Sequence, residues 1–288
     1  MTASTLTVRK LPGRNEIEML ARRISQVFHR SGRKIHFAFA ERLMRLHDLV
    51  LERQDEILDL ICWETGKARK HAFDEPLHIA LTARYYARTA HQHLGTRRSP
   101  GVVPVLTKVE INRLPKGVVG IISPWNYPAN LTFGPLVSAL AAGNTVILKP
   151  SEMTPHTTAV MVRLVRELFS EDEVAIFDGD ASVSTALLEL PFDHIFFTGS
   201  PAIGKVVMAA AAKHLTSVTL ELGGKSPTIV DETADLKAAA KNILWGKYTN
   251  NGQTCIAPDH IYVHESVKAE FIAQCREVLH SSYGETQQ

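Results

Sequence analysis

The sequence predicts an α/β protein: a doubly wound parallel sheet, preceded by a helical segment and followed by the start of a second α/β domain. Three observations support this. Apolar residues recur at helical spacing through residues 16–93. From residue 117, short apolar runs alternate with helical patterns, and the alternation resumes after residue 222. Repeated β–α alternation with short apolar strands is typical of a parallel sheet that is covered on both faces.

The N-terminal segment is predicted to be amphipathic and helical. Within 41–60, apolar residues such as Leu43, Leu46 and Leu49 recur among charged ones, as in a helix packed on one side. Gly66, in Glu-Thr-Gly-Lys-Ala, is a predicted helix stop, and a further helix is expected over 73–93.

Residues 95–115 follow a different pattern. Three turn-forming residues, Pro100, Gly101 and Pro104, precede the alternating run 107–113. Alternation predicts a strand with one solvated face. Such a ribbon could lie on the surface or pair with a partner chain.

The sheet and its helices are predicted from the alternation that follows. Strands are expected at 117–123, 145–148, 174–177, 194–198 and 217–220, and helices at 131–142, 156–169, 181–188 and 203–213. A second group has strands at 227–230 and 261–263 and helices at 236–248 and 267–279. We therefore divide the chain into domains at 1–220 and 221–288. Ligands of such sheets bind at the carboxyl ends of the strands.

Composition excludes several classes of partner. The 288 residues are 45% hydrophobic and 22% charged, and the net charge is +2. This balance argues against nucleic acid and an anionic membrane as partners. The basic cluster 67–71 and the Arg97-Arg98 pair are predicted to be solvated surface. No apolar run reaches the length of a membrane span.

Cysteine and histidine usage bounds the chemistry further. Cys62, Cys255 and Cys275 form no Cys-x-x-Cys pair, which favours free thiols in a reducing compartment and hence a cytoplasmic protein. No His-x-x-x-His or Cys/His cluster is present, so no metal site is predicted.

Cys255 is the predicted nucleophile. It lies in Asn-Asn-Gly-Gln-Thr-Cys-Ile-Ala-Pro, a polar turn, whereas Cys62 and Cys275 fall inside helical patterns and are expected to be small buried residues. Glu221, between Leu220 and Leu222, is expected to lie in apolar surroundings and to act as a general base; the alternative is a partly buried, hydrogen-bonded structural carboxylate.

Three further segments are candidates for binding. Gly199-Ser-Pro-Ala-Ile-Gly204 follows a predicted strand and opens a helix; its backbone N–H groups could bind phosphate, or the segment could be an ordinary capped helix. Lys149 and Glu152 follow another strand and could bond ribose hydroxyls, or form an ordinary polar loop. In Pro124-Trp-Asn-Tyr-Pro128, the two aromatic residues are mainly expected to pack in the core, and the amide of Asn126 could donate to an oxyanion.

Together these strings, with Leu-Glu-Leu-Gly-Gly-Lys-Ser-Pro at 220–227, resemble the aldehyde dehydrogenase superfamily, most closely its class 3 branch, which includes fatty- and coniferyl-aldehyde enzymes. The resemblance implies a Rossmann-variant NAD-binding domain in which 95–115 is an oligomerisation ribbon. It implies oxidation of an aldehyde through a thiohemiacetal and a thioester on Cys255, with Asn126 and the Cys255 N–H as oxyanion donors and Glu221 activating water. The implied cofactor contacts are Ile122, Trp125, Lys149, Glu152, Gly199, Ser200, Gly204 and Leu222.

The same resemblance implies a cofactor, a substrate and an assembly. A carboxylate at Glu152 favours NAD, with NADP also possible. A long-chain or aromatic aldehyde and a homodimer are expected. Because the family's later Glu-x-Phe-Gly-Pro segment is missing, 221–288 is expected to be the truncated first part of a catalytic domain. Two alternatives stay open: a cofactor-binding module without turnover, and a cofactor-independent cysteine esterase.

Overall fold

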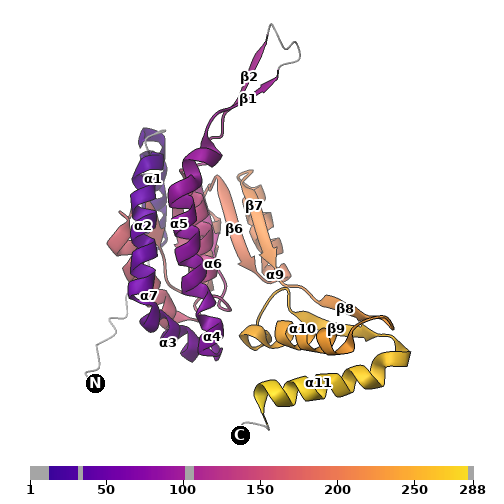
Figure 1. The fold of residues 1–288 in the computed structure, drawn as a ribbon. Helices are drawn as coiled ribbons and strands as arrows, with labels where there is room; N and C mark the ends of the chain where they lie inside the picture. Colours follow the sequence, from indigo (N-terminus) through magenta and orange to yellow (C-terminus); the bar gives the residue numbers. More distant parts are fainter. Residues whose placement is uncertain (1–12, 32–34, 101–106, 285–288) are drawn as a thin grey trace, which may run out of the picture.

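The computed structural model describes residues 13–31, 35–100 and 107–284. A helical layer, a parallel sheet with its own helices, and a small C-terminal α/β unit follow one another along the chain (Figure 1). No helix within these ranges is both long enough and apolar enough to cross a bilayer.

The helical layer consists of α1 (Arg14–Ser31), α2 (Ile35–Glu52), α3 (Gln54–Thr65), α4 (Arg69–Ala72) and α5 (Asp74–Leu94). Helices α2 to α5 pack on one face of the sheet, whereas α1 packs on the opposite face. Leu43, Leu46 and Leu49 are buried in the main core, as their spacing predicts. Helix α3 ends at Gly66, which adopts a left-handed conformation and donates its N–H to the Cys62 carbonyl. The predicted helix stop at Gly66 is thus confirmed.

The central sheet has five parallel strands in the order β5-β4-β3-β6-β7. The strands are β3 (Val118–Ile122), β4 (Thr145–Lys149), β5 (Val174–Ile176), β6 (His194–Gly199) and β7 (Ser217–Leu222). Their connecting helices are α6 (Asn130–Ala141), α7 (Pro155–Leu168), α8 (Ala181–Leu188) and α9 (Pro201–Ala212). Order and direction are those of a doubly wound sheet, so the predicted fold class is confirmed.

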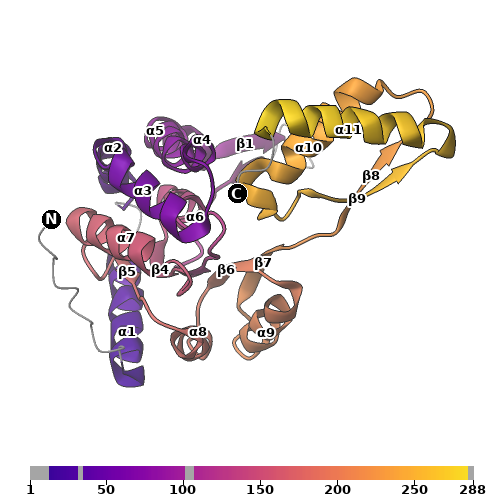
Figure 2. The same ribbon diagram turned by 90° about the horizontal axis from the view of Figure 1, so that it is seen from below.

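Side chains of β4 pack into two hydrophobic clusters, one on each face of the sheet. Val146 and Leu148 join the cluster formed with α2, α5, α6 and α7, whereas Ile147 between them joins the cluster formed with α1, α8 and α9. Figure 2 shows α8 and α9 on the side of the sheet opposite α6. Burial on both faces explains why the strands read as continuous apolar runs.

The C-terminal unit has its own small core. Strands β8 (Ser226–Val230) and β9 (Pro258–Val263) pair in parallel, and α10 (Leu236–Tyr248) and α11 (Lys268–Tyr283) pack together with them around Val230, Ala240 and Phe271. Strand β7, predicted to end at Leu220, continues to Leu222, so Glu221 belongs to the central sheet. The unit begins beyond that strand.

A two-stranded hairpin projects from the body in Figure 1. Strands β1 (Arg97–Pro100) and β2 (Lys108–Ile111) are antiparallel, with Arg97 opposite Ile111; residues 101–106 between them lie outside the described ranges. The ribbon predicted at 95–115 is therefore present. The expectation of a single solvated face is wrong, because every residue of β2 is exposed, including Val109 and Ile111.

Candidate active site

A cavity of about 500 Å³ lies at the carboxyl ends of β3, β6 and β7. Parallel strands bring their loops to one edge of the sheet, so residues that are far apart in the sequence meet there. Nine of the eleven predicted site residues line the cavity: Ile122, Trp125, Asn126, Glu152, Gly199, Ser200, Glu221, Leu222 and Cys255.

The other two predicted residues, Lys149 and Gly204, do not line the cavity but contact residues that do. Lys149 is buried and donates from Nζ to the Pro150 carbonyl at 2.7 Å and to Glu152 Oε2 at 3.4 Å. Burial lowers the pKa of Lys149, while the Glu152 carboxylate opposes that shift. Glu152 is exposed at the cavity, so this pair presents a carboxylate to a ligand.

Gly204 allows close packing of α9 against the sheet. A Cβ at this position would stand 2.9 Å from Leu222 Cδ2. The glycine therefore lets the helix approach β7, and Leu222 reaches the cavity wall. This is the packing role of a third glycine in a dinucleotide-binding turn.

The N-terminus of α9 opens beside the cavity. Ser200 caps it by accepting a hydrogen bond from the Ile203 N–H at 3.3 Å, and Pro201 occupies the first helical position. Gly199 precedes the cap, and the partial positive charge of the helix end favours an anion here. The hydroxyl of Thr198 lies buried without a hydrogen-bond partner, and Thr198 itself lines the cavity. These features fit a dinucleotide pyrophosphate.

Asn126 is fixed from two sides. Its side-chain Nδ2 donates to the backbone carbonyl of Gln253 at 2.8 Å. Its backbone carbonyl accepts from Lys67 Nζ at 2.7 Å and from Asn250 Nδ2 at 2.9 Å. An amide nitrogen carries two N–H groups, so the bond to Gln253 leaves a second donor for a ligand.

Cys255 lies at the end of a tight turn over 249–256, which we call the Cys255 turn. Two consecutive asparagines, Asn250 and Asn251, take left-handed conformations with φ of 54° and 56°. Asparagine adopts this region more readily than most residues. Cys255 is exposed and lines the cavity, whereas Cys62 and Cys275 are half-buried and burial raises the pKa of each thiol.

Glu221 approaches the same cavity from β7, where it pairs in register with Thr198 of β6. The expectation of apolar surroundings is wrong for Glu221, and so is the alternative of partial burial, since its side chain is exposed. Its neighbours Leu220 and Leu222 both pack in the hydrophobic cluster on the α9 face of the sheet. In a strand, the side chain between them points to the opposite face.

Two other expectations also require correction. The cluster 67–71 is not wholly solvated: Lys67 is 2% exposed and forms an ion pair with the fully buried Glu75 at 2.8 Å. Tyr127 is half-buried; its hydroxyl lies 2.8 Å from that of Thr254, and Lys67 Nζ lies 4.3 Å from its ring centroid. A charged pair eight residues apart gives no sequence signal of burial, so Lys67 and Glu75 were missed.

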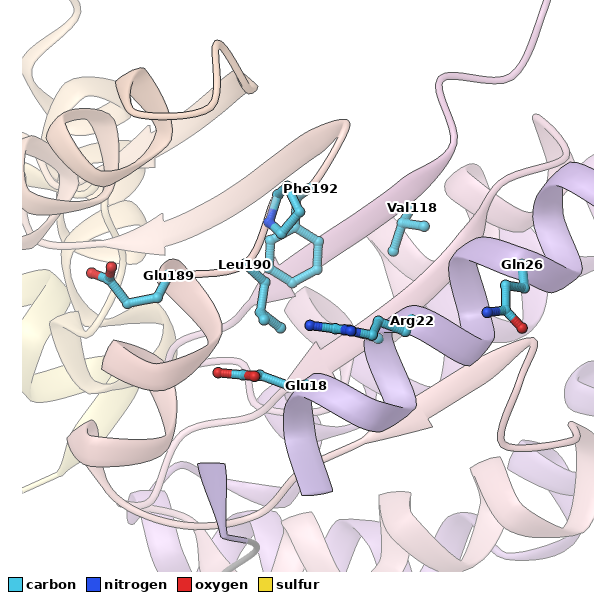
Figure 3. A pocket seen from close by; sticks show the side chains of 9 residues that line it. Glu18, Arg22, Gln26, Val118, Glu189, Leu190 and Phe192 are labelled. Atoms are coloured by element: carbon cyan, nitrogen blue, oxygen red, sulfur yellow. The ribbon is translucent and has the colours of Figure 1, made fainter. Parts of the chain in front are cut away.

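A second hollow lies between α1 and the segment leading to β6, near the amino end of β3 (Figure 3). Glu18 and Arg22 of α1 and Leu190 and Phe192 line it, and none of the predicted site residues does. Over the ranges with described coordinates, no three His, Cys, Asp or Glu side chains gather in a group that could hold a metal ion.

The strand-end cavity brings together a thiol, an amide, a carboxylate and a capped helix N-terminus that could hold an anion. Residues 27–285 match the model of the aldehyde dehydrogenase family. The chain belongs to this family. The resemblance inferred from its motifs is confirmed.

Individual relatives agree. The chain is 42% identical over 247 residues to the 4,4'-diaponeurosporen-aldehyde dehydrogenase of Staphylococcus aureus, covering 85% of this chain and 54% of the relative. It is 50% identical over 175 residues to the dimeric NADP-preferring aldehyde dehydrogenase of Mus musculus, covering 61% and 39%. The solved substrate-bound Staphylococcus aureus AldH superposes with a TM-score of 0.89 at 38% identity, over 94% of this chain and 59% of that one. The chain thus spans about half the length of these relatives.

Proposed function

We propose that this chain carries the cofactor site and the reacting groups for NAD(P)-dependent oxidation of an aldehyde to a carboxylic acid. The observation that carries the proposal is the meeting of Cys255, Asn126 and Glu221 with the N-terminus of α9 around one cavity. Family membership supports aldehyde oxidation as the reaction.

The chemistry begins at Cys255. Its thiolate adds to the aldehyde carbon, forming a C–S bond and a thiohemiacetal oxyanion. The remaining N–H of Asn126 and the backbone N–H of Cys255 stabilise that oxyanion. A nicotinamide held at this cavity would supply the hydride acceptor; loss of hydride from the thiohemiacetal carbon would leave a thioester on the Cys255 sulfur.

Glu221 completes the proposed reaction. Its exposed carboxylate takes a proton from water, and the resulting hydroxide adds to the thioester carbonyl. The C–S bond then breaks, which releases the carboxylic acid and returns Cys255 as a thiolate. The exposure of Glu221 suits contact with solvent water.

The cavity lining supports a set of cofactor contacts. Gly199 and Ser200 would hold the pyrophosphate, and Glu152, with Lys149 behind it, would bond the adenosine ribose hydroxyls. Ile122, Trp125 and Leu222 supply apolar walls. The carboxylate of Glu152 disfavours a 2′-phosphate, so NAD is preferred and NADP is accepted more weakly.

Substrate, assembly and location extend the same proposal. A long-chain or aromatic aldehyde is supported by the names of two relatives, the 4,4'-diaponeurosporen-aldehyde dehydrogenase of Staphylococcus aureus and the probable coniferyl aldehyde dehydrogenase of Pseudomonas aeruginosa. A homodimer is supported by the name of the mouse relative and by the exposed β1–β2 hairpin. All three cysteines are free, which suits a reducing cytoplasmic compartment.

The test is NADH formation by the purified 288-residue chain with a panel of aliphatic and aromatic aldehydes. Cys255→Ala should abolish it, and the matched changes Cys62→Ala and Cys275→Ala should preserve it. A folded chain that binds NAD but forms no NADH contradicts turnover and supports a binding module. Ester hydrolysis that depends on Cys255 without aldehyde oxidation supports a cysteine esterase.

A further inference from the structure

The chain between α3 and α4 contacts the Cys255 turn directly. We call residues 65–71 the α3–α4 corner. The Gln253 side chain donates to the Thr65 carbonyl at 3.0 Å, and the Asn251 side chain donates to the Gly66 carbonyl at 2.7 Å. The Asn250 N–H points at His71 Nδ1, 3.4 Å away. A segment of the N-terminal helical layer therefore holds the turn that carries the nucleophile.

Lys67, in the same corner, bonds the loop that carries Asn126. Its Nζ donates to Glu75 Oε1 at 2.8 Å and to the Asn126 carbonyl at 2.7 Å. Both side chains of the Lys67–Glu75 pair have no exposed area. Burial lowers the pKa of Lys67 and raises that of Glu75, while each partner's charge opposes the shift of the other.

Glu75 is itself anchored to the loop that carries Asn126. Its Oε2 accepts the backbone N–H groups of Ala129 and Asn130, both at 3.0 Å. These groups stand at the start of α6, where a carboxylate is favoured by the helix end. Glu75 thus binds the loop just after Asn126, and Lys67 donates to the backbone carbonyl of Asn126 itself.

A buried ion pair is weak evidence for stability, because desolvating two charges offsets most of their attraction. This pair instead holds one of two loops of defined geometry that share a hydrogen-bonded oxygen. One carries Asn126; the other contains Asn250 and Asn251, whose left-handed conformations persist only where surrounding contacts fix them. Asn250 Nδ2 bonds the same Asn126 carbonyl that Lys67 does, so one oxygen ties both loops together.

We propose that Lys67, held by Glu75, is a positioning residue that sets the Asn126 amide against the Cys255 turn. The inference rests on the proposed function for its catalytic consequence, and on the geometry alone for the ordering of the two loops. Lys67 touches no reacting atom and acts through Asn126.

The test compares wild type with Lys67→Met/Glu75→Gln. The glutamine can still accept from Ala129 and Asn130, and removing both charges avoids leaving one buried ion unpaired. The matched control is Lys213→Met/Glu189→Gln, which removes an exposed lysine–glutamate pair, 2.9 Å apart, from outside the α3–α4 corner. Thermal unfolding establishes that each variant is folded.

The first readout is backbone hydrogen–deuterium exchange in peptides spanning 124–131 and 249–257, which requires no turnover. We expect exchange at least tenfold faster in both peptides for the Lys67/Glu75 variant, with peptides of β3, β4 and β6 unchanged. Exchange equal to that of the control overturns the inference, whether or not the chain is an enzyme.

The second readout is kcat and KM for aldehyde oxidation or ester hydrolysis. We expect kcat to fall about tenfold or more with a smaller change in KM, and no further fall when the pair is removed from an Asn126→Ala chain. A loss of equal size in that background overturns the route through Asn126. Wild type without any turnover contradicts the proposed function alone, and exchange then decides the positioning role.

Discussion

Asn126 and Gln253 are joined by a 2.8 Å hydrogen bond across 127 residues of sequence, from a side-chain amide to a backbone carbonyl. The bond links the loop after β3 to the Cys255 turn, which belong to different structural units. Because Gln253 lies two residues before Cys255, this bond fixes the predicted oxyanion donor, Asn126, relative to the predicted nucleophile, Cys255.

Glu221→Gln should separate formation of the thioester from its hydrolysis. A neutral amide cannot take a proton from water, so steady-state turnover should fall on the order of a hundredfold or more. Rapid-mixing measurement should still show a first-turnover burst of NADH. Glu232→Gln, an exposed carboxylate outside the cavity lining, is the control and should leave both phases intact. A burst lost together with turnover would show that Glu221 acts earlier.

Asn250→Ala should destabilise the chain more than Asn250→Gly. Both changes remove the bonds from Nδ2 to the Asn126 and Gln253 carbonyls. Only alanine also places a Cβ in the left-handed region, which costs about 1–2 kcal/mol. Urea denaturation measures the free energy of unfolding of each. Equal losses in the two variants would show that backbone strain at this position is unimportant.

Gly199→Ala should crowd the anion-binding end of α9. The added Cβ would stand 2.5 Å from Cζ of the buried Phe197, so ring or backbone must move, at about 1–3 kcal/mol. Gly223→Ala is the matched control, because its Cβ would meet no atom within 4 Å. Denaturation and NAD titration should both distinguish the two, and a Gly199→Ala chain as stable as Gly223→Ala would refute the packing argument.

His71 should make the α3–α4 corner sensitive to acid. Burial, and then the charge of Lys70, lower the pKa of His71, while Asp74 opposes the shift. The folded chain therefore takes up this proton less readily than the unfolded chain. The resulting stability is fully present above the ordinary histidine pKa of about 6.5 and declines as the pH falls below it.

The check is the free energy of unfolding at pH 7.5 and 5.5 for wild type and His71→Asn. Asparagine keeps an acceptor for the Asn250 N–H and does not titrate. We expect a smaller decline for the variant, since other groups such as His194, whose pKa burial also lowers, titrate in both chains. Identical declines would exclude a contribution from His71.

Local patterns predicted most of the fold and most of the cavity. Each strand of the central sheet is a short apolar run, and parallel pairing brings the polar residues after β3, β6 and β7 to one edge. Ile122, Gly199 and Leu222, the last residues of these three strands, meet at that edge through the same pairing. Such reasoning depends only on which strand each residue follows.

What the sequence did not reveal depends on tertiary contact. Lys67 lies in a run of basic residues and has no mark that distinguishes it from the exposed Arg69 and Lys70. Its burial arises only when α5 brings Glu75 beside the loop after β3. The exposure of Glu221 was missed for a related reason: its neighbours in sequence are apolar, but in a strand they face the other way.

The bond between Thr65 and Gln253 spans 188 residues. Bringing together segments so far apart in sequence costs loop-closure entropy, which the contacts of the folded chain must offset. The thiol of Cys255 therefore has its final surroundings only when the first helices and the last unit are both in place. A truncated or misfolded intermediate would still contain the cysteine, but the arrangement that gives it a defined partner at Asn126 would be absent.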